Sequence, residues 1–336
     1  MTGVAITQCN RRQCNRRAVW LVLLSALELG CGSFAAAQSS ASAPTAAQTQ
    51  PAGFQHTVRL APLSTTVSAD ATRWHSRPLV TLTGTIVRFD AEQIQVLGND
   101  QTVPTGYAAD RVVDIAFTQI PGDQREAIAQ FQQQNFAAAL PALIRCVSDR
   151  ETDSRPPVWR QQWLSMLAAQ AAMRSNRGEI AIELVKQLDA RPMPLMVLAL
   201  LPIDWTGSVG EPLREAAVQA AASDSPAVKL VAASWLLRSR EYRASADAAL
   251  GRLANQRDRP ELAGLAEMLR WRAKPPPEIQ AGIMDWETEI QSLPMVMRTG
   301  PMICLLDVAR QVGLQEVARK WELVLKHAVP TWHPDR

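Results

Sequence analysis

The hydrophobic pattern of this chain changes its period once, near Pro121 and Gly122, and this change constrains the fold most. Before that point, short segments alternate apolar and polar residues or are rich in Val, Ile and Thr, as in β-strands. After it, apolar residues recur every three or four positions, as in amphipathic α-helices. The pattern predicts a small all-β unit at residues 54–120, a helical unit at 121–330 and a short tail at 331–336, with each unit burying its own apolar face.

The expected strands are short and separated by turn residues. They cover residues 57–60, 79–89, 93–97, 101–103 and 111–117. Asp90, Ala91 and Glu92 form the hairpin turn between the second and third of them. Five short strands in about 65 residues predict a small closed β-barrel.

Residues 84–90, which read Gly-Thr-Ile-Val-Arg-Phe-Asp, resemble one hairpin of the SH3-like barrels, among them the Sm-like proteins. The resemblance covers that hairpin only, and it implies the barrel shape. The Sm proteins that bind RNA place an asparagine shortly after the aspartate, whereas this chain has Gln93 and Ile94 there. It also lacks their second, glycine-bearing motif near Val112. We therefore expect the barrel without an RNA site.

The helical unit is expected to hold about a dozen short helices joined by turns of mostly two to five residues. Four of its turns have an apolar residue before them and a small residue after them. The small residues are Ala139, Ala181, Ala246 and Ala318. This arrangement resembles tetratricopeptide repeats, where a small residue lets two helices approach closely. The turns lie about 42, 64 and 72 residues apart, against about 34 in that family, which predicts an irregular helical-hairpin solenoid with no defined repeat count.

Residues 1–37 have the three parts of a secretory signal peptide: four arginines, an apolar run at residues 18–27 and three alanines at 35–37. We expect cleavage after Ala37 and export to the periplasm or cell envelope. Glu28 follows the apolar run and disfavours its retention as a membrane anchor. A lipid on Cys31 and twin-arginine export are the alternatives. Residues 38–53 predict a disordered tether, and no later stretch is apolar enough to predict a membrane span.

Charge argues against nucleic acid as the main partner. The chain has 35 basic and 32 acidic residues. Four of the basic residues and one of the acidic residues lie in the export segment, so the remainder has no net formal charge. Binding to phosphates needs a basic excess. Two cysteines remain outside the export segment, Cys146 and Cys304; we expect buried thiols, and the sequence leaves open whether they pair.

The sequence contains no Gly-rich phosphate loop, no His-Glu-x-x-His pair, no Cys-x-x-Cys pair and no nucleophile elbow. We therefore expect no catalytic residues, no cofactor and no metal site. The acidic residues Glu278, Asp285, Glu287 and Glu289 are expected to complement the basic helices of residues 238–274. The histidines are expected to be solvated. They are His56, His75, His327 and His333.

The tryptophans offer the one candidate binding feature. Large aromatic residues between helical hairpins usually belong to the core. Trp159 and Trp163 are four residues apart on one helical face, and they are the candidates for lining a ligand groove.

These features favour an exported, non-enzymatic interaction or scaffold protein of the cell envelope. Its helical stack would bind a protein or peptide partner, and the barrel would add a second contact. The alternative is an envelope carbohydrate-binding protein or hydrolase with a groove lined by tryptophans and carboxylates. The sequence specifies neither the partner nor the oligomeric state.

Overall fold

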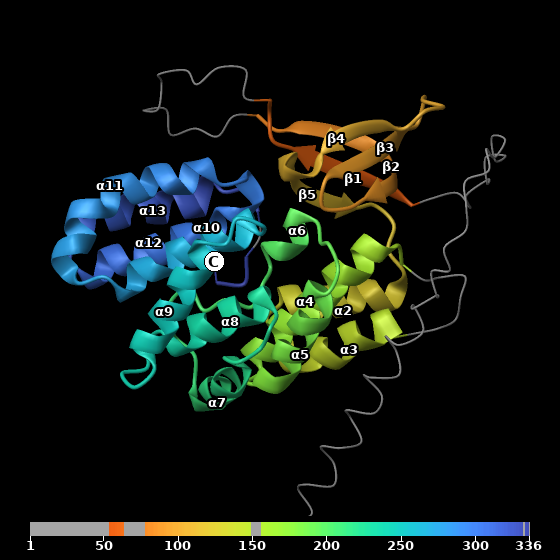
Figure 1. Cartoon of the computed structure of the whole chain (residues 1–336). Helices are drawn as coiled ribbons and strands as arrows, with labels where there is room; N and C mark the ends of the chain where they lie inside the picture. Colours follow the sequence, from red (N-terminus) through yellow and green to blue (C-terminus); the bar gives the residue numbers. More distant parts are fainter. Residues whose placement is uncertain (1–53, 64–77, 149–155, 332, 336) are drawn as a thin grey trace, which may run out of the picture. The chain divides into compact units, whose positions relative to one another are not determined.

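The computed structural model describes residues 54–63, 78–148, 156–331 and 333–335. The predicted signal peptide with its cleavage site at Ala37, the tether at residues 38–53 and His75 lie outside these residues. All described residues belong to one compact unit, Ala52–Arg336. They form twelve α-helices and one five-stranded antiparallel sheet (Figure 1). This confirms the expected mainly helical class with a small sheet on its N-terminal side.

The sheet has the order β4-β3-β2-β1-β5, and all neighbouring strands are antiparallel. The strands are β1 (Gln55–Leu60), β2 (Val80–Phe89), β3 (Gln93–Gly98), β4 (Thr105–Ala108) and β5 (Val112–Phe117). Four of them confirm predicted strands. The strand expected at residues 101–103 is wrong, and β4 begins after Pro104 instead. Proline has no N–H to donate to a strand ladder, so pairing starts beyond it.

The inward face of the sheet is apolar, and the pairing has two irregularities. Val58, Ile94 and Ile115 are buried on three different strands. The register shifts in the β1–β5 and β2–β3 pairings, and such bulges bend a sheet. Gly84 on β2 allows close approach of β3, because a Cβ atom there would lie 2.3 Å from the carbonyl oxygen of Leu97.

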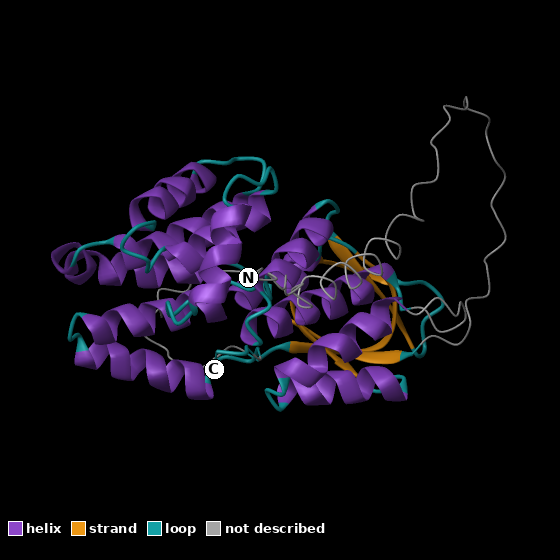
Figure 2. Cartoon of the chain, turned by 90° about the horizontal axis from the view of Figure 1, so that it is seen from below, coloured by secondary structure: helices purple, strands orange, loops and turns teal. Residues whose placement is uncertain are grey.

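Most consecutive helices pack side by side along the chain (Figures 1 and 2). The helices are α2 (Gly122–Gln132), α3 (Phe136–Ser148), α4 (Val158–Arg174), α5 (Gly178–Asp189), α6 (Leu195–Leu198), α7 (Glu211–Ala220), α8 (Pro226–Leu236), α9 (Arg243–Ala254), α10 (Pro260–Arg270), α11 (Pro276–Ser292), α12 (Thr299–Gln311) and α13 (Gln315–His327). Helix α6 contacts α4 and β5 instead. The sequence did not predict α7, whose buried face is Leu213 and three alanines, because alanine contributes little to a hydrophobic pattern. Helix α2 begins after Pro121 without a side-chain cap.

Three of the four predicted hairpin turns share one backbone geometry. Gln134, Asn176 and Gly313 have φ values of 61°, 58° and 79°. At each turn the N–H of the following residue reaches the carbonyl five residues before it, at 2.9, 2.7 and 2.9 Å. This is the Schellman arrangement, which ends a helix and satisfies its last carbonyl groups. The α2–α3, α4–α5 and α12–α13 hairpins are therefore built alike.

The small residues predicted after the turns are buried. Ala139 and Ala181 are fully buried, Ala246 is 3% exposed and Ala318 is 4% exposed. Gly178, the first residue of α5, lets this helix approach α7 closely, because a Cβ atom there would lie 2.7 Å from the Cβ atom of Ala216. The positions inferred to bring helices together therefore do lie in helix contacts.

One apolar core runs through the sheet and the helices, from Val58 on β1 to Leu325 on α13. Helix α6 contacts β5, so the sheet and the helical region touch (Figure 1). Whether residues 54–120 and 121–330 fold independently stays a prediction.

Both cysteines of the helical region are buried free thiols, as expected. Burial raises the pKa of Cys146 to about 11 and that of Cys304 to about 12. Within the described ranges, no helix is both long and apolar enough to cross a membrane.

Candidate functional site

A cavity of about 490 Å³ lies next to strand β5. Its wall comes from β5, helices α2, α4 and α6, the start of α12, and the chain around Thr331 and His333. This volume is in the range of small-molecule pockets. Most of the wall is apolar, and its exposed members, Ala116 on β5 with Arg125 and Gln132 on α2, mark where the cavity opens to solvent.

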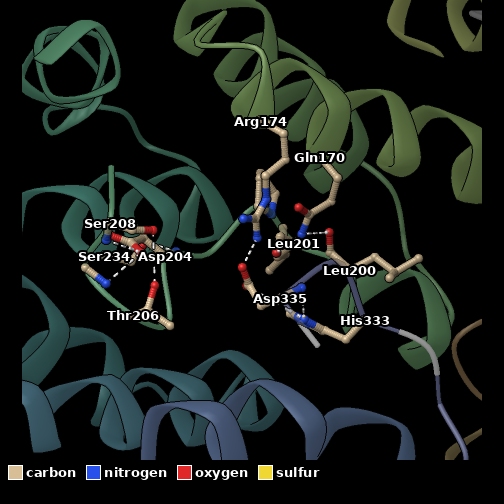
Figure 3. Close-up of polar contacts among 12 residues, drawn as sticks. Gln170, Arg174, Leu200, Leu201, Asp204, Thr206, Ser208, Ser234, His333 and Asp335 are labelled. Carbon is tan, nitrogen blue, oxygen red and sulfur yellow. Dashed lines mark hydrogen bonds and ion pairs between the residues drawn. The ribbon is translucent and has the colours of Figure 1, made fainter. Parts of the chain in front are cut away.

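Helix α6 is held in place by a buried glutamine. Its segment carries prolines before and after it, and its apolar residues Met196 and Leu200 line the cavity. The side-chain N–H groups of Gln170 on α4 donate to the carbonyl oxygens of Leu200 and Leu201, at 3.0 and 2.9 Å (Figure 3). Because Gln170 is 1% exposed, these two bonds fix one wall of the cavity in an environment without competing water.

The chain beyond α13 returns to the cavity instead of fraying. Asp335 forms a hydrogen-bonded ion pair with Arg174 on α4 (Figure 3). The hydroxyl groups of Thr299, the first residue of α12, and Thr331 are 2.6 Å apart. These contacts tie the segment to two helices, so the expectation of a solvated His333 is wrong.

The imidazole of His333 is buried in the cavity wall and is 4% exposed. Its Nδ1 accepts a hydrogen bond from the backbone N–H of Asp335 at 3.2 Å. Its Nε2 has no hydrogen-bond partner among the described residues. Burial lowers the pKa of His333 to about 4, with Arg174 acting in the same direction and Asp335 against it. The ring is therefore neutral at pH 7.

A second buried histidine lies among aromatic rings. His56 on β1 is 6% exposed, so the expectation that it is solvated is also wrong. Its ring centroid lies 5.6 Å from that of Phe117 and 5.9 Å from that of Trp159. Its Nδ1 has no partner in the described part of the chain. Burial, and then the charge of Arg160, lower the pKa of His56 to about 4.

Arg160 adds an unusual buried charge to this aromatic cluster. It is 2% exposed, and its guanidinium carbon lies 4.4 Å from the centroid of the Phe117 ring. Its Nε and Nη2 atoms have no hydrogen-bond partner among the described residues. Burial lowers the pKa of Arg160 to about 10. The face of the Phe117 ring and the nearby carboxylate of Asp123 both favour the cation.

The two tryptophans proposed for a groove both pack on Phe117. Trp159 is 3% exposed and stacks on the Phe117 ring at 6.0 Å with nearly parallel planes. Trp163 is half-buried, lies 5.3 Å from the same ring and lines the cavity. Trp163 is thus the member of the pair placed to contact a ligand, whereas Trp159 contributes to the core.

Asp204 organises the loop that follows α6 (Figure 3). Its carboxylate accepts hydrogen bonds from the backbone N–H groups of Gly207 and Ser208 at 2.7 and 3.1 Å, and its own N–H donates to Ser234. Gly207 has a φ of 73°, and a Cβ atom there would collide with Arg272. These bonds give Asp204 a role in loop structure.

Of the acidic residues of α11, Glu278 pairs with Lys274 as expected, whereas Glu287 pairs elsewhere. Glu287 is 7% exposed and accepts hydrogen bonds from Lys320 at 2.6 Å and from the indole N–H of Trp321 at 2.9 Å. Its partners therefore lie on α13 and not in residues 238–274. The described residues contain no group of three or more His, Cys, Asp or Glu side chains that could hold a metal ion.

The chain matches no protein-family model, no curated protein and no solved structure.

The sequence reasoning found Trp163 but missed His333 and the pairs Thr299–Thr331 and Arg174–Asp335. These contacts join residues 32 and 161 positions apart, and hydrophobic periodicity reports only on neighbours along one element. Two prolines near residue 333, at 330 and 334, were the one local sign of a restricted backbone.

Proposed function

We propose that this protein is an exported, non-enzymatic interaction protein of the cell envelope that holds an apolar group of a protein partner in the cavity beside β5. The observation that carries this proposal is the cavity itself. It combines a volume of about 490 Å³ with a mostly apolar wall and an opening between β5 and α2. Such a pocket receives apolar groups, while its few polar groups set their orientation.

The charged groups around the cavity support binding more than catalysis. Its titratable lining residues are Arg59, Asp114, Arg125 and His333. Asp114, the carboxylate among them, is paired with Arg59, whose Nε and Nη2 groups both donate to Oδ2. A hydrolase of sugars needs two carboxyl groups facing one space. The alternative function as a hydrolase therefore has less support.

Two finer features of the fold belong to the same proposal. We take the sheet to be a small barrel, because its edge strands β4 and β5 are joined directly by the 3-10 turn Ala109–Arg111 and two bulges bend it. We take the helices to be an irregular solenoid, because most of them, though not α6, pack mainly on helices near them in sequence.

A photo-crosslinking amino acid tests the proposed function. Benzoylphenylalanine is placed at Ala129, which lines the cavity on α2, and in a matched variant at Ala137, which is exposed on α3 outside it. The full chain is expressed in its own cells, irradiated and analysed by mass spectrometry. We expect a polypeptide adduct from position 129 that position 137 does not form. A glycan adduct at position 129, or no adduct there, would overturn the proposal.

A further inference from the structure

The unpartnered Nε2 of His333 is a hydrogen-bond donor. A neutral imidazole carries one proton, and it can lie on either ring nitrogen. Nδ1 accepts from the backbone N–H of Asp335 at 3.2 Å, while the Asp335 carboxylate is 3.7 Å away, too far for a hydrogen bond. Because Nδ1 is the acceptor, the proton belongs on Nε2.

A buried donor of this kind carries a cost when nothing accepts its proton. An unsatisfied buried polar group costs about 1 to 3 kcal/mol, and most buried polar side-chain atoms in proteins have a partner. The nearby hydroxyl groups of Thr299 and Thr331 already bond to each other at 2.6 Å. An acceptor supplied by whatever enters the cavity would remove this cost.

We infer that the group held in this cavity is apolar and carries an uncharged hydrogen-bond acceptor, such as a carbonyl oxygen, that binds the Nε2 proton of His333. This inference rests on the proposed function and names the chemistry that the cavity selects. The apolar wall around the acceptor includes Ile128, Phe131 and Leu200. A positively charged group is disfavoured by this wall and by Arg174 close to the ring. The low pKa of His333, about 4, keeps the ring neutral and removes the need for an anionic ligand.

Two probes that differ only at the acceptor test this inference. Benzophenone has a carbonyl group, and 1,1-diphenylethylene has a carbon-carbon double bond in its place. Affinities of both are measured by calorimetry for the wild type, for His333→Phe and for the matched control His327→Phe, which changes an exposed histidine outside the cavity. We expect the affinity ratio of benzophenone to diphenylethylene to fall about tenfold in His333→Phe, the value for one buried hydrogen bond, and to stay unchanged in His327→Phe.

The outcomes separate the inference from the proposed function. If neither probe binds the wild type, the cavity does not take apolar groups and the proposed function fails. If both probes bind and their affinity ratio is the same in His333→Phe as in the wild type, the inference is overturned, whereas the proposed function keeps its support. Should His333→Phe not fold, nitrogen NMR of the wild type decides: a proton on Nε2 that shifts with benzophenone supports the inference, and an unprotonated or unresponsive Nε2 contradicts it. The source of the carbonyl group is read from the crosslinking experiment at position 129. The mass of the adduct there shows whether the bound group belongs to a polypeptide or to a free small molecule.

Discussion

The two buried histidines differ in what lies beside them. His56 touches Phe117 and Trp159, and its surroundings are filled with aromatic rings and the guanidinium of Arg160. His333 lines a cavity of about 490 Å³. Both have a pKa of about 4 and one ring nitrogen without a partner among the described residues.

The difference teaches that an unsatisfied buried nitrogen indicates a ligand only where space exists for one. Phe117 separates the two environments, because it packs on the His56 side and also lines the cavity. We read the His56 side as a filled core that tolerates a polar atom, and the His333 side as a site. The following predictions test this contrast.

The largest effect is expected on the filled side. Trp159→Ala removes a ring that packs on His56, Phe89 and Phe117, and it should lower the free energy of unfolding by about 3 to 5 kcal/mol. Trp163→Ala removes the half-buried ring at the cavity and should lower the free energy of unfolding clearly less than Trp159→Ala does. Denaturant titrations of both variants measure this. Equal losses would mean that Trp159 and Trp163 do not differ in packing.

Acid should destabilise the protein through both histidines. Their pKa values are about 4 in the folded state and about 6.5 in an unfolded chain. Between these values the unfolded state binds more protons, so the free energy of unfolding falls as the pH falls from about 6.5 to 4. Each histidine contributes up to about 3 kcal/mol.

The pH dependence is measured by denaturant titration between pH 7 and 5. In that window His333→Phe should show a smaller loss than the wild type, and the exposed control His327→Phe should match the wild type. A wild-type stability that stays constant from pH 7 to 5 would show that neither imidazole is held neutral by burial.

Smaller effects are expected from alanines that become leucine. Ala139→Leu and Ala318→Leu place a larger side chain in filled helix contacts and should cost about 1 to 3 kcal/mol. Ala129→Leu makes the same change at a residue that lines the cavity, and it should lower the free energy of unfolding less than either of them. Ala52→Leu, in the predicted tether, should cost nothing measurable. If Ala139→Leu and Ala318→Leu unfold at the same denaturant concentration as Ala52→Leu, the pairing of the helices is wrong.

The hairpins were predictable because their signals are local. The residues around Ala139, Ala181 and Ala318 combine a turn, a helix period and a small residue within about ten positions, and the structure shows the same Schellman turn at all three hairpins. Helix α7 was missed because its face is mostly alanine. Strand β4 was misplaced because Pro104 delays pairing.

The site was less predictable than the fold. Trp163 was recognisable as a large aromatic residue on a helix, but the sequence cannot show that Trp159, four residues away, would be covered by Phe117. His333 lies between Thr331 and Asp335, which bond to residues of α12 and α4 that are far away in the chain. Such contacts follow from tertiary packing and leave no periodic signal.

Crystals of the full chain pressurised with xenon test the central claim most directly, because xenon enters apolar cavities that are empty and large enough. The account predicts xenon density between Phe131 and Leu200 and none among His56, Phe117 and Trp159. Xenon beside His56, or no xenon in the cavity that His333 lines, would contradict it.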